Sequence, residues 1–396
     1  MTAAPDRTPA GTGLPPVLWL FALCNFVIGT GAFGMTGYLG PLADDLGVSV
    51  SAAGQTMTAY ALANALLAPW VMAGTGRWPR RQVMLLALGV FAAGTALSAA
   101  APALGWLLAG RVLMGVGAVF TPVAAGVAVA LVAPQRRGKA LARTFLGMSL
   151  SYVLGVPFGA WLGLAHGWPW PLWAVTAASV LMLWLVWRQV PAHIGTPGNG
   201  FAGLGGLLRQ REVWLTLLFT LLYFTSIFTV SAYMGPVQLA LNPLSPSALT
   251  ATLMVLGLAG VAGTLIGGWA ADRHGPRRTL RWQIGCMAVA LALAPWTAGH
   301  HALTVLAFSA VTVCGFGMMT PQQSRLAECA FAQAPMLLSL NASMVYIGTA
   351  AGAAVGGAAI PWLGFAHLSW IGAAFAALGA LTLLPRFRHP PPTTKQ

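Results

Sequence analysis

Long apolar stretches, interrupted by short polar segments, follow one another along almost the whole chain. A helix needs roughly 20 apolar residues to cross a bilayer, and stretches of about this length recur throughout. They lie at residues 17–38, 53–74, 83–101, 104–132, 141–165, 169–187, 213–238, 247–271, 282–299, 302–322, 338–363 and 367–385. The pattern predicts an all-α membrane protein with twelve transmembrane helices.

Composition excludes an ordinary soluble protein, because 58% of the residues are hydrophobic, only 7% are charged and the mean hydropathy is +0.77. A net charge of +14 would suit a nucleic-acid partner, but the distribution of the charge favours another explanation. Apart from Arg111, every Lys and Arg falls near a terminus or in alternate loops, on one side of the predicted membrane. This positive-inside distribution predicts that both termini are cytoplasmic and argues against nucleic-acid binding.

A polar, Gly- and Pro-rich interval divides the predicted helices into two sets of six. We therefore expect an N-terminal six-helix half at 1–187, a cytoplasmic linker at 188–212, a C-terminal six-helix half at 213–386 and a cytoplasmic tail at 387–396.

The two halves repeat short motifs in the same order, about half a chain apart, which predicts two parallel pseudo-repeats. The first member of each pair is followed here by its counterpart: Tyr38-Leu39-Gly40-Pro41 and Tyr233-Met234-Gly235-Pro236, Arg80-Arg81 and Arg277-Arg278, Gly115-Val116-Gly117 and Gly315-Phe316-Gly317. In such a pair of halves, substrate binds near the midplane and rocking exposes it to each side in turn.

Further motifs lie in two loops and two helices. The loop after the eighth predicted helix contains Asp272-Arg273-His274-Gly275-Pro276-Arg277-Arg278, and the loop after the second contains Arg77-Trp78-Pro79-Arg80-Arg81. In the fourth helix Arg111 precedes Gly115-Val116-Gly117, and the fifth contains Gly155-Val156-Pro157-Phe158-Gly159.

With these motifs the chain resembles the transporters of the major facilitator superfamily, from Phe21 to about Leu384. Within that superfamily it is similar to the twelve-helix bacterial arabinose-efflux-like and drug:proton antiporter permeases. Gly76 stands where the family's first loop has an acidic residue, and Pro79 stands where that loop has its second glycine.

The resemblance implies gating roles for one set of residues. The basic residues of this set are equally explained by the positive-inside rule, and its glycines by helix packing. The set comprises Arg77, Arg80, Arg81, Asp272, Arg273, Gly275, Arg277 and Arg278 in the loops, and Gly155, Pro157 and Gly159 in the fifth helix.

Polar and aromatic residues on the helices that would line the cavity are the candidates for substrate binding. They are uncharged apart from one arginine, which suits a small neutral or anionic organic solute better than a metal ion, whose ligands would be clustered carboxylates or imidazoles. The candidates are Asn25, Asn64, Arg111, Tyr152, Tyr223, Tyr233 and Asn341.

Arg111 is the one charged residue well inside an apolar stretch, and such a residue is costly in lipid. Two explanations remain open. Arg111 either donates to helix carbonyls and to polar side chains such as Asn25 or Thr30, or faces the cavity and binds an anionic or carbonyl-bearing substrate.

Proton coupling has no obvious carrier, because no Asp, Glu, His or Lys lies inside a predicted span, apart from His367 at the external boundary of the last one. Similar permeases carry an acidic residue in the first helix where this chain has Ala32. Three possibilities follow: the substrate itself carries protons, the external Asp44 or Asp45 titrates, or transport is not proton-coupled.

The predicted function is secondary active transport of a small organic solute across the bacterial cytoplasmic membrane, most simply efflux by antiport with protons as candidate coupling ions. A facilitated importer or uniporter is the alternative, and a non-transporting sensor or scaffold is a minor one. No nucleotide-binding or catalytic motif indicates a pump or an enzyme. We expect a lipid-embedded monomer that needs no cofactor or metal.

Overall fold

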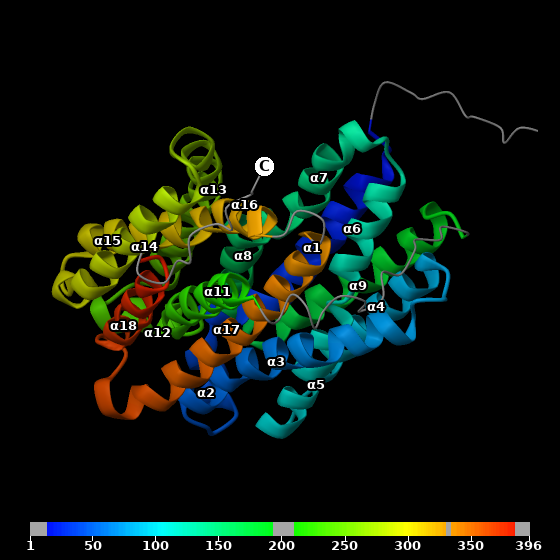
Figure 1. Cartoon of the computed structure of the whole chain (residues 1–396). Coiled ribbons are helices and arrows are strands. Elements are labelled where there is room, and N and C mark those ends of the chain that lie inside the picture. Colours follow the sequence, from blue (N-terminus) through cyan, green and yellow to red (C-terminus); the bar gives the residue numbers. More distant parts are fainter. Residues whose placement is uncertain (1–13, 193–209, 330–333, 385–396) are drawn as a thin grey trace, which may run out of the picture.

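The computed structural model describes residues 14–192, 210–329 and 334–384, and the regular elements in these ranges are all helical (Figure 1). The N-terminal part contains α1 (Val17–Phe33), α2 (Leu39–Asp45), α3 (Val50–Gly74), α4 (Arg80–Ala99), α5 (Leu104–Gly117), α6 (Phe120–Ala130), α7 (Arg137–Leu150), α8 (Val156–His166) and α9 (Pro169–Gln189). The C-terminal part contains α11 (Arg211–Ser231), α12 (Met234–Leu241), α13 (Pro246–His274), α14 (Pro276–Leu293), α15 (His301–Gly317), α16 (Met319–Cys329), α17 (Ala334–Leu363) and α18 (Leu368–Leu381). Short turns complete it: 3₁₀ turns η1 (Gly34–Gly37), η2 (Pro134–Arg136) and η4 (Ala294–Thr297), and the π-helical turn η3 (Ser151–Gly155).

Each of the twelve predicted stretches contains helix, and the all-α membrane fold is confirmed. Within the described ranges, nine helical segments are long and apolar enough to cross a membrane by length and composition. The count of twelve spans and the side on which the termini lie stay predictions. Most of the predicted linker and the whole predicted tail, 387–396, fall outside the described residues.

In four places one helix ends and the next begins within a few residues, at α1 and α2, α5 and α6, α11 and α12, and α15 and α16, and a proline accounts for each of these breaks. A proline lacks the N–H that an inner helical residue donates, and its ring clashes with the carbonyl four residues earlier. In α2, α6, α12 and α16 the proline is the third residue, where an N–H is not needed, and the preceding helical segment ends at or beside the residue four positions earlier. These prolines are Pro41, Pro122, Pro236 and Pro321.

The repeated Tyr-x-Gly-Pro motifs adopt nearly the same backbone conformation. Tyr38 precedes α2 with φ −125° and ψ 27°, and Tyr233 precedes α12 with φ −119° and ψ 23°. The sequence repeat therefore corresponds to a repeated local structure.

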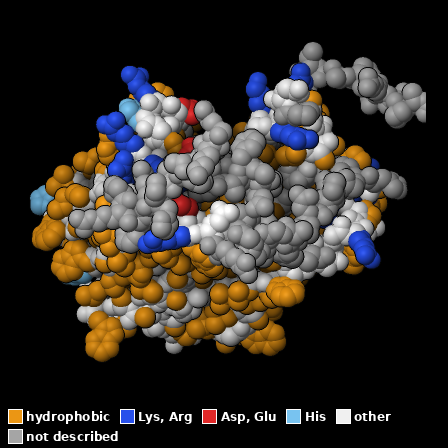
Figure 2. Space-filling model, viewed as in Figure 1, with side chains coloured by type: hydrophobic (Ala, Val, Ile, Leu, Met, Phe, Trp, Pro, Cys, Tyr) orange, Lys and Arg blue, Asp and Glu red, His pale blue; other side chains and the backbone are white. Residues whose placement is uncertain are grey.

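The surface is apolar and bears aromatic residues suited to a membrane interface. Every tryptophan except Trp168 is exposed, and tryptophan is enriched where membrane meets water. Figure 2 shows Lys and Arg side chains along the upper edge of the visible face, with hydrophobic side chains covering most of the lower part.

The two halves pack against each other mainly through elements near the predicted external end. α17 runs along α3, α13 contacts η3 and α8, and α12 contacts η1 and α2. By contrast, α6, α7 and α16 make their main contacts with helices of their own half. In Figure 1, α7 and α13 stand apart at the top, whereas α3 and α17 lie together lower down.

Candidate functional site

Arg111 lies on α5 with none of its surface exposed, and its guanidinium reaches the end of α1. Nη1 donates to the Gly31 carbonyl at 2.7 Å and Nη2 to the Ala32 carbonyl at 2.9 Å. Its Cζ lies 5.6 Å from the centre of the Tyr60 ring. Nε is buried and has no hydrogen-bond partner among the described atoms.

The end of a helix explains how this charge is held without a carboxylate. The last carbonyls of a helix lack partners within the helix, and the aligned peptide dipoles place partial negative charge there. Arg111 supplies two donors to the last turn of α1, beside an aromatic ring that also favours a cation. The guanidinium thus acts as a cap on α1, supplied by another helix.

The side chains expected beside Arg111 have other partners. Asn25 donates to the Thr144 carbonyl at 2.9 Å and accepts from the Thr121 hydroxyl at 2.7 Å. The Thr30 hydroxyl donates to the carbonyl of Phe26 in its own helix at 2.8 Å.

Three more substrate candidates are buried within a single half. Asn64 donates to the Gly115 carbonyl at 3.0 Å. The Tyr223 hydroxyl lies 3.1 Å from the Met319 sulfur, and Asn341 accepts from the Thr220 hydroxyl at 2.6 Å. In this conformation all three join helices of the same half to one another.

Tyr152, in contrast, lies between the halves. Its ring stacks on Phe33 at 4.8 Å between centroids and meets Phe316 edge-on at the same distance. Phe33 in turn lies 6.0 Å from Phe228. We call Phe33, Tyr152, Phe228 and Phe316 the interface aromatic cluster, because α1 and η3 of one half meet α11 and α15 of the other.

Sequence reasoning found only Tyr152 of this cluster. Two signals were available for other members: Phe316 stands inside the repeated Gly-x-Gly motif, and Phe33 directly follows Ala32. Neither signal says that the two rings meet across the halves.

Tyr233 joins a second contact between the halves, made of hydrogen bonds to α17. Its hydroxyl donates to the Ala353 carbonyl at 2.8 Å and accepts from Gln55 at 3.4 Å. Ser51 donates to the Gly357 carbonyl at 2.5 Å, and Thr58 to the Ala350 carbonyl at 3.5 Å. Residues spaced by three or four share one helix face, so α3 presents a continuous polar edge to α17.

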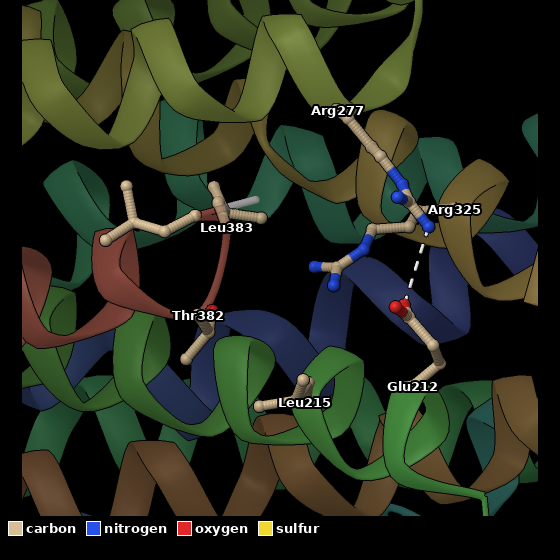
Figure 3. A pocket seen from close by; sticks show the side chains of 7 residues that line it. Glu212, Leu215, Arg277, Arg325, Thr382 and Leu383 are labelled. Atoms are coloured by element: carbon tan, nitrogen blue, oxygen red, sulfur yellow. Dashed lines mark hydrogen bonds and ion pairs between the residues drawn. The ribbon is translucent and has the colours of Figure 1, made fainter. Parts of the chain in front are cut away.

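Arg277, one of the predicted gating residues of the C-terminal half, forms an ion pair in the described part of the chain. Arg277 pairs with Glu212 at 3.5 Å, and both side chains are partly exposed. In Figure 3 these two side chains point toward each other with Arg325 beside them, in a pocket also lined by Thr382 and Leu383. Asp272 is exposed, and the ion pair that the described residues give Arg277 is with Glu212. Glu212 was not among the sequence candidates.

Three other residues of this loop have distinct settings. The guanidiniums of Arg273 and Arg278 lie over the rings of Trp269 and Trp282, at 5.7 and 4.7 Å. Gly275 joins α13 to α14 with φ +80°, a conformation that side chains other than glycine rarely adopt.

The corresponding loop of the N-terminal half is built differently. Pro79, with φ −54°, precedes α4 where Gly275 precedes α14. Arg77 is exposed and Arg81 half-buried, whereas Arg80 is buried and donates to the Gly76 carbonyl at 3.4 Å.

The glycines of the fifth predicted helix face α1 in the same half. A side chain at Gly155 would overlap Thr30, and a Cβ at Gly159 would lie 3.6 Å from Gly34. Pro157 follows the π-helical turn η3, and the carbonyl that its ring would crowd belongs to Val153 inside that turn.

No group of three His, Cys, Asp or Glu side chains able to hold a metal ion occurs in the part of the chain that the structure describes.

Comparison with known proteins identifies the family. The sequence model of the Major Facilitator Superfamily matches residues 21–330 and 244–396. The MFS-type transporter YbcL of Bacillus subtilis is 28% identical over 355 residues, covering 86% of this chain and 87% of YbcL. A chloramphenicol resistance protein of Streptomyces lividans is 31% identical over 270 residues, covering 66% of this chain and 68% of its own.

Among solved structures, a bacterial homologue of the lysosomal transporter Spinster, in an inward-facing and occupied conformation, has a TM-score of 0.79 at 15% identity. The match covers 95% of this chain and 98% of the homologue.

The helical fold and these relatives thus define a multi-pass transporter of the bacterial cytoplasmic membrane. The chain belongs to the Major Facilitator Superfamily.

Proposed function

We propose that this transporter exports a small neutral or anionic organic solute by alternating access, with residues 1–187 and 213–386 as the two moving halves. The observation that carries the proposal is the one-ended contact between the halves. At the predicted external end, α3 binds α17 through Ser51 and Thr58 and binds Tyr233 through Gln55, whereas α7 and α16 make their main contacts within their own halves. Opening the external end requires these hydrogen bonds to break.

The interface aromatic cluster supports an amphipathic solute as substrate. Its rings offer apolar faces at the junction of the halves, and Tyr152 adds a hydroxyl there. Such sites bind organic ligands through apolar walls and a small number of polar groups. Asn25, Asn64, Tyr223, Tyr233 and Asn341 would then become accessible, or shape the cavity, as the halves rock.

The contacts of Arg111 help to decide whether the solute is neutral or anionic. In the described conformation two of its donors are used by α1. A neutral solute leaves this cap intact, whereas an anion would have to compete with two carbonyls for the guanidinium. The geometry therefore favours a neutral solute.

The gating roles follow from the same movement. Arg277 with Glu212, and Arg80 with the Gly76 carbonyl, anchor helix ends on the side that would close when the external side opens. On that side, we propose that ion pairs form and break as the halves move, and that they involve Arg77, Arg81, Asp272, Arg273 and Arg278. Gly275 would form the turn that orients the residues of its loop. Gly155, Pro157 and Gly159 would let the π-helical turn bend against α1.

Counterflow into proteoliposomes, with a panel of neutral, anionic and cationic solutes of similar size, tests the proposal. We expect uptake of a neutral aromatic solute, lowered at least tenfold by Tyr152→Leu or Phe316→Leu. Phe308→Leu is the matched control, because that ring is buried within one half. Uptake of no solute, or equal loss in all three variants at equal folded amounts, would refute the proposed site.

Efflux is favoured over import by the resistance protein among the relatives. One observation favours the facilitated importer or uniporter. At the position of the family's acidic residue, Ala32 contributes only a backbone carbonyl, which cannot carry a proton. Counterflow with and without an imposed pH gradient separates the two, because only an antiporter responds to the gradient with net movement against the solute gradient.

The external aspartates can be tested in the same assay. Asp45 already accepts from the Trp168 indole at 2.6 Å. If Asp44 or Asp45 carries the proton, combined Asp44→Asn and Asp45→Asn substitution abolishes pH-driven transport. Coupled proton flux that survives both changes excludes this route.

A further inference from the structure

A cavity of about 110 Å³ lies inside the N-terminal half, between α1, α8 and α9. Its walls are almost entirely apolar and include Phe26, Val27, Phe158, Leu172, Val175 and Ala178. Thr30 and Tyr38 are the polar side chains of this lining, and the Thr30 hydroxyl is already donated to Phe26. Because a buried water needs two to four polar partners, the cavity is better suited to an apolar occupant.

The position of the cavity determines what can enter it. All three walls belong to segments long and apolar enough to span a membrane, Val17–Gly37, Arg137–His166 and Pro169–Gln189. Phe158 at its rim is 52% exposed, and Trp161 and Trp173 on the same two helices, α8 and α9, are also exposed. The rim therefore faces the surroundings of the helix bundle at membrane depth, where lipid chains are the abundant apolar groups.

Missing side chains create much of this space. A Cβ placed on Gly34 would meet no atom within 4 Å, and one on Gly159 would meet only atoms 3.6 Å away or further. Gly34 has φ −59° and ψ −30°, an ordinary helical conformation, so the backbone does not require glycine there. A larger residue would fit the backbone and fill the cavity.

We propose that this cavity holds the end of an acyl chain of a membrane lipid. An engineered apolar cavity of roughly 150 Å³ stays dry and binds benzene, so a space of this order suffices for a short apolar segment. The chain end would pack against Gly31, whose carbonyl binds Arg111, and against Tyr38, where α1 gives way to α2. A lipid chain would thus pack against the break between α1 and α2 from the side of α8 and α9. This site is separate from the interface aromatic cluster.

Photocrosslinking tests this directly. The full-length protein is placed in nanodiscs of phosphatidylcholine that contains a small fraction of the same lipid with a diazirine at the chain end. Crosslinked residues are mapped by mass spectrometry. We expect crosslinks at Phe26, Thr30 or Ala178 to be at least threefold more frequent than at Leu265 and Ile266, which are exposed on α13.

Filling the cavity provides the matched comparison. Gly34→Leu should lower crosslinking at those residues at least threefold, and Gly285→Leu on α14 should not, although a Cβ there also meets no atom within 4 Å. Ala178→Leu fills the same space from α9 and serves if Gly34→Leu does not fold. Crosslinking no higher than at Leu265 and Ile266, or unchanged in a folded filled variant, would overturn the proposal whether or not transport is observed.

Discussion

The two halves bend their helices in the same places but hold their charges differently. Tyr38 and Tyr233 precede equivalent short helices with nearly equal backbone angles, and prolines divide the fourth and tenth predicted helices alike. Arg111, however, has Val311 as its counterpart in the repeat, and Arg80 donates to the Gly76 carbonyl at the position where Arg277 pairs with Glu212. The repeat has kept the residues that shape the helices, whereas the ionisable groups have diverged.

This difference assigns separate tasks to the halves. In the N-terminal half a fully buried cation caps the end of α1, so removing it leaves carbonyls without partners in a dry environment. In the C-terminal half the described ion pair is partly exposed, where solvent weakens its contribution. The comparison predicts a large effect for the first charge and a small one for the second.

Replacing Arg111 should therefore have the largest effect. Arg111→Met removes two charge-assisted hydrogen bonds, each worth about 1.5–3 kcal/mol, and leaves the Gly31 and Ala32 carbonyls buried. We expect the free energy of unfolding to fall by about 3 kcal/mol, measured by denaturant titration in detergent. The stability of Arg111→Lys should lie between those of the unchanged protein and Arg111→Met, because an ammonium keeps the charge but lacks the planar fork that reaches both carbonyls.

Val311→Met gives the matched control at the repeated position. Val311 is also buried, and methionine is larger than valine by about one methylene, so the exchange should cost about 1 kcal/mol, at the lower end of the range for overpacking. An equal loss of stability at both positions would show that Arg111 is not a cap but merely occupies space.

The helices themselves were predictable because a bilayer crossing demands length and apolarity together. Their divisions were not predicted, although the prolines are visible in the sequence. A proline shows that one hydrogen bond is lost, but neighbouring contacts decide the outcome. The helix stops before Pro41, adopts a π-helical turn at Pro157 and continues through Pro69 and Pro361.

The site was predictable as a set of residue types but not as a set of contacts. Asn25 and Tyr152 were equally good candidates, yet one is satisfied inside its half and the other meets Phe316 across the halves. That difference depends on how each helix is rotated about its axis and on neighbours more than a hundred residues away. Glu212 was missed for the same reason, since its partner Arg277 lies 65 positions along the chain.

Restoring an acid in the first helix is the next largest change. Ala32 is fully buried, so Ala32→Glu should cost about 1–3 kcal/mol of stability through overpacking. If the missing acid is why this half relies on α1 carbonyls, solute transport should depend on pH in Ala32→Glu more strongly than in the unchanged protein. Ala32→Gln is the isosteric control, and an equal pH dependence in both variants would contradict this explanation.

The paired tyrosines provide a more modest comparison. Tyr233→Phe loses the hydrogen bonds to Ala353 and Gln55, and should destabilise the protein by about 1 kcal/mol. It should also increase the spin-label distance between α3 and α17 at the predicted external end, because Gln55 belongs to the other half. Tyr38→Phe is the repeat-matched control, since no hydrogen bond is described for the Tyr38 hydroxyl. A larger loss of stability, or a larger change in distance, in Tyr38→Phe would contradict the role of Tyr233 in holding the two halves together.

Breaking the ion pair of the C-terminal half should have the smallest effect on stability. The Arg277 and Glu212 side chains are 37% and 36% exposed and lie 3.5 Å apart, and exposed pairs contribute about 0.2–1 kcal/mol. We expect Arg277→Gln to lower the free energy of unfolding by less than about 1 kcal/mol, with a loss that shrinks further in 0.5 M salt because such charges are screened. Arg278→Gln, on the neighbouring exposed arginine, controls for net charge. A loss from Arg277→Gln as large as that from Arg111→Met would mean that both halves depend on a fixed charge, and that the asymmetry lies in the sequence but not in the energetics.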